Sequence, residues 1–235
     1  MVPIKEALTF DDVTLAPRYS EILPSETDTS IVLTNFLNLK VPLLSSAMDT
    51  VTESKMAIAM AKAGGLGVIH RNLDIINQIK EIKKVKKEKL LVGAAVGAGP
   101  NEFKRAEMIL KENINMIVVD TAHGHTKKVA DMIKFIKKKK NTKTALCAGN
   151  IATAEAAKFL YKLGVDIIKV GIGPGSICTT RLVAGIGVPQ LSAILNVKNA
   201  LKNNNVKIIS DGGIKYSGDL AKAFAAGADA VMIGS

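Results

Sequence analysis

The chain has 235 residues, 48% of them hydrophobic, which is enough for one large core and a common size for a single α/β barrel domain. Aromatic residues make up only 4% of it and Trp is absent, so we expect an aliphatic core, which favours helices packed on a sheet over a β-sandwich. Two cysteines exclude a disulfide framework, and no apolar stretch approaches the ~20 residues of a membrane helix. Because the N-terminus also lacks the apolar core of a signal peptide, we expect a cytoplasmic protein without membrane contact.

The net charge of +11 is concentrated in two lysine-rich runs, 80–89 and 134–143. Such runs can indicate a nucleic-acid-binding surface. Around both runs, however, aliphatic residues recur at helical spacing, as at Ile79, Ile82 and Val85. This spacing predicts amphipathic helices with lysines on the solvent side, so nucleic acid is not an expected partner.

Residues 1–40 predict an irregular segment that packs over one end of the fold. After it, apolar runs that suit buried parallel strands alternate with helical patterns. The predicted strands are 41–47, 67–70, 91–96, 116–120, 144–148, 167–170, 207–210 and 230–233. The helical patterns between them are 54–62, 75–84, 102–111, 127–138, 154–163, 192–202 and 219–226. The sequence therefore predicts a TIM (β/α)8 barrel over 1–235, a single catalytic domain with its eighth strand at the C-terminus and the last helix missing.

An internal similarity supports the barrel. Residues 163–171 are echoed by 226–234, and in each copy a Gly closes a helix, an Asp enters a strand and a second Gly opens the next loop. The alternative is a doubly wound open sheet. The Gly-rich fingerprint expected after the first strand of such a sheet is replaced here by Ser45-Ser46-Ala47-Met48-Asp49.

A glycine-rich loop at 171–181 follows the sixth predicted strand. In a barrel the C-terminal ends of the strands converge on one face, where barrel enzymes carry their chemistry. The glycines let backbone amides approach an oxyanion, with the Ser176 hydroxyl as a further donor. Cys178 is a candidate nucleophile, because the positive surroundings supplied by the cradle and by Arg181 would favour its thiolate. The alternative is a glycine-rich turn around a small buried Cys.

Glycine-rich turns follow the seventh and eighth strands at Gly213 and Gly234, where barrels usually bind phosphate. Asp211 does not suit a phosphate cradle, because its carboxylate would repel the anion. A carboxylate does accept hydrogen bonds well from two hydroxyls. A phosphate beside a ribose diol satisfies both features, so the sequence indicates a nucleoside monophosphate ligand.

Several long motifs together resemble the inosine-5'-monophosphate (IMP) dehydrogenase family. They lie, in order, at 8–12, 45–53, 120–125, 171–181, 211–219 and 232–235. The resemblance implies NAD-dependent oxidation of IMP to XMP, a step of guanine nucleotide biosynthesis, through a covalent thioimidate on Cys178. It also implies a cytoplasmic homotetramer with IMP, NAD and a potassium ion as ligands.

The same resemblance implies a role for individual residues. Cys178 would be the nucleophile and Thr180 would position the hydrolytic water. The residues implied in IMP binding are Ser46 and Met48 along the nucleotide, Asp211 on the ribose, and Ser176, Gly213, Gly234 and Ser235 on the phosphate. Asp120 would bind the ribose of NAD, with Asn150 near the reacting centre. Potassium would bind to the backbone carbonyls of Gly173, Gly175 and Cys178, since a ring of carbonyl oxygens suits that ion.

Two departures from the family pattern carry expectations of their own. Many members have regulatory CBS modules after the second strand, whereas 72–90 is long enough only for a helix, so we expect no CBS domain there. The family's mobile flap and its water-activating arginine and tyrosine lie beyond Ser235. The chain as given is therefore expected to bind IMP, with full turnover not expected.

Simpler roles remain open for several of these residues. Asp120 is also a plausible cap for the next helix, Asn150 a turn former and Cys147 an inert core thiol. His123 and His125 form only a weak metal pair. At the level of the whole chain, the alternatives are a GMP reductase, which converts GMP to IMP with NADPH, and a non-catalytic barrel that binds nucleotide or nucleic acid.

Overall fold

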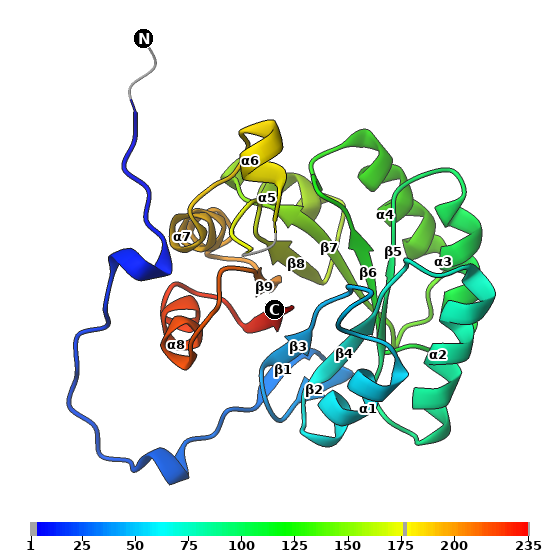
Figure 1. The fold of residues 1–235 in the computed structure, drawn as a ribbon, viewed down its shortest axis with the longest axis horizontal. Coiled ribbons are helices and arrows are strands. Elements are labelled where there is room, and N and C mark those ends of the chain that lie inside the picture. Colours follow the sequence, from blue (N-terminus) through cyan, green and yellow to red (C-terminus); the bar gives the residue numbers. More distant parts are fainter. Residues whose placement is uncertain (1–3, 176–177, 235) are drawn as a thin grey trace.

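The computed structural model describes residues 4–175 and 178–234. Eight parallel strands close into a barrel in which every strand pairs with its neighbours in the chain and the last pairs with the first (Figure 1). The strands are β3 (Leu43–Ser45), β4 (Leu66–Ile69), β5 (Gly93–Val96), β6 (Met116–Asp120), β7 (Ala145–Ile151), β8 (Ile167–Val170), β9 (Lys207–Asp211) and β10 (Ala230–Ile233). The predicted TIM barrel is confirmed, and the open doubly wound sheet is excluded.

The helices surround the barrel, as Figure 1 shows. They are α1 (Ser54–Lys62), α2 (Ile75–Lys87), α3 (Glu102–Leu110), α4 (Lys127–Lys139), α5 (Ala154–Lys162), α6 (Thr180–Ala184), α7 (Gln190–Ala200) and α8 (Ser217–Ala225). All seven predicted helices form, and the short α6 is an addition. The aliphatic residues of α2 and α4 are buried, so their lysine runs lie largely on the solvent side, as predicted.

Alternation along each strand divides the core into two layers. In β6, Met116 and Val118 pack in the barrel interior, whereas Ile117 and Val119 pack against the surrounding helices. Both faces of the strand are therefore apolar. This explains why each strand is a nearly continuous hydrophobic run in the sequence.

Part of the N-terminal segment is more regular than the sequence indicates. An antiparallel hairpin of β1 (Ile31–Thr34) and β2 (Leu37–Leu39) follows two single 3₁₀ turns, η1 (Phe10–Asp12) and η2 (Pro24–Glu26). Leu33, Leu37 and Leu39 are buried in the same cluster as the barrel interior. The amide N–H of Lys40 donates to the carbonyl of Gly64, just before β4, so the hairpin closes the end of the barrel where the strands begin.

Upstream of the hairpin, the segment crosses α7 and α8. The amide N–H of Leu8 donates to Ser192 Oγ at 2.8 Å, and Lys222 Nζ donates to the carbonyl of Phe10 at 2.7 Å. Phe10 itself is buried. Across the described ranges, no helix combines the length and the apolarity that crossing a membrane requires.

The hairpin is expected to contribute to stability through its buried leucines. Leu37→Ala should lower the free energy of unfolding by about 2–5 kcal/mol, because Leu37 is fully buried and its truncation leaves a cavity under the barrel. Val32→Ala is the matched control on the same hairpin: Val32 is 55% exposed, and a change within about 0.5 kcal/mol is expected. Urea unfolding measures both, and equal effects would contradict this role of the hairpin.

Candidate active site

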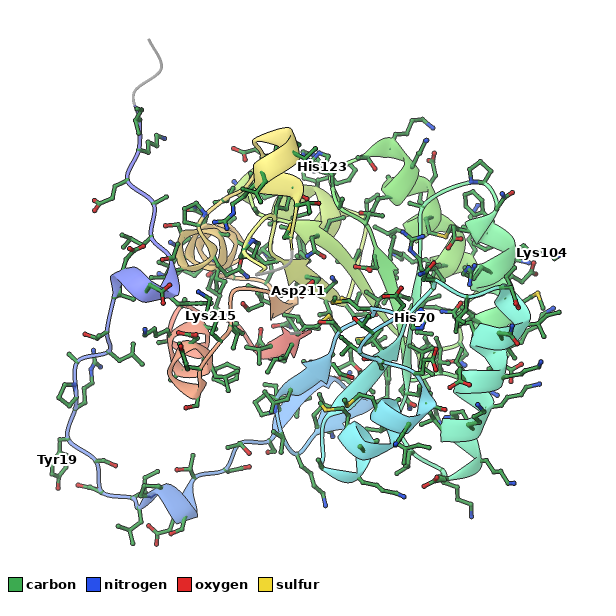
Figure 2. All side chains as sticks on the ribbon, viewed as in Figure 1. Tyr19, His70, Lys104, His123, Asp211 and Lys215 are labelled. Atoms are coloured by element: carbon green, nitrogen blue, oxygen red, sulfur yellow. The ribbon has the colours of Figure 1, made fainter. Side chains whose placement is uncertain are left out.

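The C-terminal ends of the strands surround an open cavity of about 760 Å³. Among the residues that line it are Ser46, Met48, Cys178, Asp211, Gly213 and Gly234, all predicted from the sequence to meet there. Figure 2 shows Asp211 at the centre of the molecule, where the strands end, with Lys215 beside it towards α8. Ser176 and Ser235, also predicted for this site, lie outside the described residues.

A second cavity of about 770 Å³ adjoins the first. Cys178, Asn150 and Asp211 line both cavities, while Asp120 and Thr180 line only the second. Ser46 and Met48 also line both cavities, whereas Gly213 and Gly234 line only the first. A ligand in each cavity would meet its neighbour at the sulfur.

Close backbone approach explains the glycines around the first cavity. The loop after β9 turns at Gly212 and Gly213 with φ of +93° and +76°, a conformation that favours glycine. A Cβ added at Gly212 would lie 3.0 Å from Pro174 Cγ, and one at Gly234 would lie 2.8 Å from Met48 Sδ. The segments after β8 and β9, and those after β10 and β3, therefore meet in two pairs with little room for a side chain at Gly212 or Gly234.

The Cys178 thiol has a pKa below its usual range. The largest cause is the hydrogen bond from the Thr180 hydroxyl. Partial burial opposes it, and the amides of Thr180 and Gly173 and the charge of Arg181 add to it. The sequence interpretation gave more weight to positive surroundings, and the structure shows that the hydroxyl contributes more. Cys147 is the opposite case, because its complete burial raises the pKa of its thiol to about 12.

The centre of the site is a buried ammonium group that sequence reasoning did not find. Lys169 Nζ lies 2.8 Å from Asp120 Oδ1 and 2.5 Å from Asp211 Oδ2, and its side chain is only 5% exposed. Burial alone would lower the pKa of Lys169, but the two carboxylates raise it, so the group stays charged. The available signal was one charged residue in the otherwise apolar strand 167–170, since a buried charge requires partners.

Asp120 and Asn150 have more specific positions than their simpler interpretations allow. Thr126 caps α4 by accepting from the amide of Val129, so Asp120 is not the cap. Burial raises the pKa of Asp120, but the charges of Lys169 and Arg71 together lower it by more than burial raises it, so Asp120 remains a carboxylate. Asn150 Nδ2 donates to Asp211 Oδ2 at 2.9 Å and to the carbonyl of Gly171 at 2.7 Å.

The comparisons with known proteins decide the family. Residues 7–235 match the model described as the IMP dehydrogenase / GMP reductase domain. The chain belongs to this family. It is 47% identical to the inosine-5'-monophosphate dehydrogenase of Borreliella burgdorferi in an alignment 281 positions long, which covers 98% of this chain and 69% of that protein. The proteins of the same name from Cryptosporidium parvum and Aquifex aeolicus are 43% and 35% identical, each covering 99% of this chain and 68% and 73% of their own lengths.

The loops that follow β3 and β4 are bonded to each other, and the first of them forms part of the wall of the first cavity. Thr52 Oγ1 donates to the carbonyl of Ser46 at 2.6 Å, and Asn72 Nδ2 donates to Asp49 Oδ2 at 2.9 Å. His70 is buried, and its Nδ1 accepts from the amide of Asn72 at 3.1 Å. Ser46 and Met48 are therefore held by bonds within and between two loops.

His123 and His125 lie beyond β6. Their ring centroids are 6.3 Å apart, and His125 packs against the ring of Phe159 at 4.6 Å. Within the residues that the structure describes, no cluster of three or more His, Cys, Asp or Glu side chains is arranged to hold a metal ion.

The hydrogen bond from Thr180 predicts how Cys178 reacts. At neutral pH iodoacetamide should modify Cys178 and leave Cys147 unmodified. Thr180→Val should slow the reaction of Cys178 several-fold, because loss of the hydroxyl raises the thiol pKa and lowers the thiolate fraction. At high pH, where Cys178 is ionised in both proteins, its reaction rates in the wild type and in Thr180→Val should converge.

Thr179→Val is the matched control, since the Thr179 side chain makes no capping bond to α6. Mass spectrometry of the alkylated peptides gives the rate at each cysteine. Equal rates for the two threonine variants, or rapid labelling of Cys147, would contradict this account of the thiol.

Proposed function

We propose that this chain oxidises IMP to XMP with NAD, a step of guanine nucleotide biosynthesis. The observation that carries the proposal is a cysteine of lowered pKa at the junction of two cavities, each with a carboxylate at its wall. The three relatives support the same activity, because all of them are inosine-5'-monophosphate dehydrogenases.

IMP would occupy the first cavity. Asp211, as a carboxylate that accepts two hydrogen bonds, suits the ribose diol. The glycine turns at Gly213 and Gly234 let amides approach the phosphate, together with the hydroxyls of Ser176 and Ser235. Ser46 and Met48 would then lie along the nucleotide, with C2 of the base towards Cys178.

The reaction would begin at the thiolate of Cys178, whose sulfur forms a bond to C2 while a proton is taken up at the adjacent ring nitrogen. NAD, when bound, supplies the acceptor for the hydride that leaves C2. Cys178 then holds the base as a thioimidate, and water adds to C2 and releases XMP and the thiol. Thr180 would orient this water, as a hydroxyl that also donates to the sulfur. Covalent capture divides one difficult oxidation into two easier steps.

The residues of the second cavity fit a dinucleotide. Asp120 is held as a carboxylate and its side chain is 28% exposed, so it can accept from ribose hydroxyls. Gly171 and Gly173 leave the wall next to Cys178 free of side chains. Arg71 on the same cavity offers a positive charge to a pyrophosphate.

The loop around Cys178 also fits a potassium ion. The amide N–H of Cys178 donates to the carbonyl of Gly175 at 3.1 Å, so these two residues lie close together. Gly173 and Gly175 line the same wall as Cys178, and each carbonyl has two lone pairs. Potassium would hold this loop in shape without a charged side chain. The homotetramer and cytoplasmic location implied by the family resemblance stay predictions.

A coupled assay tests the function. With IMP and NAD the chain should form a covalent adduct detectable by mass spectrometry and release reduced nicotinamide in a single turnover, since full turnover is not expected of the chain as given. Cys178→Ala should abolish both, whereas Cys147→Ala, the matched control in the core, should keep them.

Three outcomes would contradict the proposed function. Oxidation of NADPH with GMP, and no reaction with IMP, would assign the reductase activity that the family name also includes. Unchanged IMP binding in Cys178→Ala, with neither adduct nor turnover in the wild type, would indicate a non-catalytic nucleotide-binding barrel. Absence of IMP binding would overturn the proposed function.

A further inference from the structure

We propose that Lys169 is a positioning residue that couples the two ligand cavities, by bridging their carboxylates and leaving one oxygen of each free for a ribose hydroxyl. The proposal rests on the function proposed above and names a residue to which that function gave no part. Lys169 lines the second cavity but is not among the residues that line the first. Its effect on a nucleotide in the first cavity would therefore pass through Asp211.

Strand register places Asp120 and Lys169 at the same level of the barrel, and Asp211 lies two residues beyond Ile209, the β9 partner of Lys169. In β8, Ile167 packs inside the barrel and Ile168 and Val170 pack against the helices, so Lys169 faces inward by alternation. Asp120 of β6 pairs with Gly149 of β7, which in turn pairs with Lys169.

Gly149 makes the bridge between these strands possible. A Cβ at this position would lie 2.8 Å from Lys169 Cβ and 2.4 Å from the Lys169 carbonyl oxygen. At position 149, between Asp120 and Lys169, strand β7 therefore carries no side chain, and the ammonium can reach across it to the carboxylate.

In each of the two carboxylates, one oxygen is bonded by protein groups and the other is not. Lys169 Nζ contacts Oδ1 of Asp120, while Lys169 Nζ and Asn150 Nδ2 both donate to Oδ2 of Asp211. Among the described residues no hydrogen bond reaches Asp120 Oδ2 or Asp211 Oδ1. These two oxygens are therefore left for ligand hydroxyls, one on a carboxylate that lines the second cavity and one on a carboxylate that lines both.

The charge of Lys169 links the electrostatic states of Asp120 and Asp211, in addition to holding their side chains in place. Two carboxylates that meet at a partly buried site without a cation between them would repel each other. The titratable groups that face Lys169 are Asp120 and Asp211, with Cys147 beneath in β7 and Arg71 acting on Asp120 from the loop after β4. Lys169 is the cation shared by both carboxylates, so its charge offsets the repulsion between them.

The test measures IMP affinity by calorimetry on the full chain. Lys169→Met should weaken IMP binding by roughly 10- to 100-fold, the factor that accompanies loss of one charged hydrogen bond. Lys169→Arg, which keeps the charge, should recover most of the affinity. Lys207→Met is the matched control, because Lys207 also pairs with an aspartate, Asp229 at 3.1 Å, but at the opposite end of the barrel.

A pH profile separates positioning from a structural role. In Lys169→Met the charge of Lys169 no longer opposes the burial of Asp120, so the pKa of Asp120 rises. IMP affinity should fall as the pH drops from about 8 to about 5, because the two carboxylates no longer share a cation. The phosphate of IMP titrates equally in every variant, so the difference from Lys169→Arg isolates the carboxylates. Because an unpaired buried carboxylate destabilises a fold, Lys169→Met/Asp120→Asn, with one charge of each sign removed, serves if the single variant does not fold. It should bind IMP as weakly as expected for Lys169→Met, since Asp211 still lacks its cation.

The outcomes distinguish the two proposals. Wild-type affinity with an unchanged pH profile in Lys169→Met, or in the double variant, would overturn the role of Lys169 and leave the dehydrogenase proposal standing. Equal weakening in Lys169→Met and Lys207→Met would also overturn it, because general destabilisation would then explain the loss. A wild-type chain that does not bind IMP would overturn both.

Discussion

The pairing of β10 with β3 is the constraint on which the rest of the structure depends. Val231 pairs with Leu43 in parallel register, and the amide N–H of Ser46 donates to the carbonyl of Ile233 at 3.0 Å. These bonds join the first and last barrel strands. The loop that carries Ser46 and Met48 is thereby placed against Gly234. In an open sheet the two would lie at opposite edges, and no cavity would contain residues from both.

Closure also produces the dry environment that the charged layer of the site requires. The hairpin β1–β2 fills the barrel from the end where strands begin, with Leu33, Leu37 and Leu39 below the aliphatic interior. The ammonium of Lys169 lies above that interior, where a charge without partners would be very unfavourable. Two carboxylates offset the cost of its burial, and their own charges are in turn compensated by it. Buried charged groups of this kind are concentrated at functional sites, where their charges take part in binding or chemistry.

Most of the framework could be predicted from the sequence, because parallel strands buried on both faces appear as apolar runs. Barrel topology alone then brings Ser46, Cys178 and Asp211 to one end, with no knowledge of side-chain positions. The contacts of Lys169 could not be predicted in this way, since they depend on the register of β6, β7 and β8 and on the missing side chain of Gly149. The hairpin and α6 were missed for a local reason: three- to five-residue elements give too few periods of hydrophobic alternation to detect.

The two cysteines show why residue type and nearby charge do not by themselves identify a nucleophile. Cys147 lies in the barrel interior close enough to Lys169 for the ammonium to lower its pKa, yet burial dominates and the thiol stays protonated. Cys178 receives less from the charge of Arg181 than from the hydroxyl of Thr180 and two backbone amides. A thiolate in this fold is stabilised mainly by short-range hydrogen-bond donors at a partly solvated loop. The segment after β8 therefore lowers the pKa of this thiol mainly through hydrogen-bond donors near the sulfur, and the charge of Arg181 adds less.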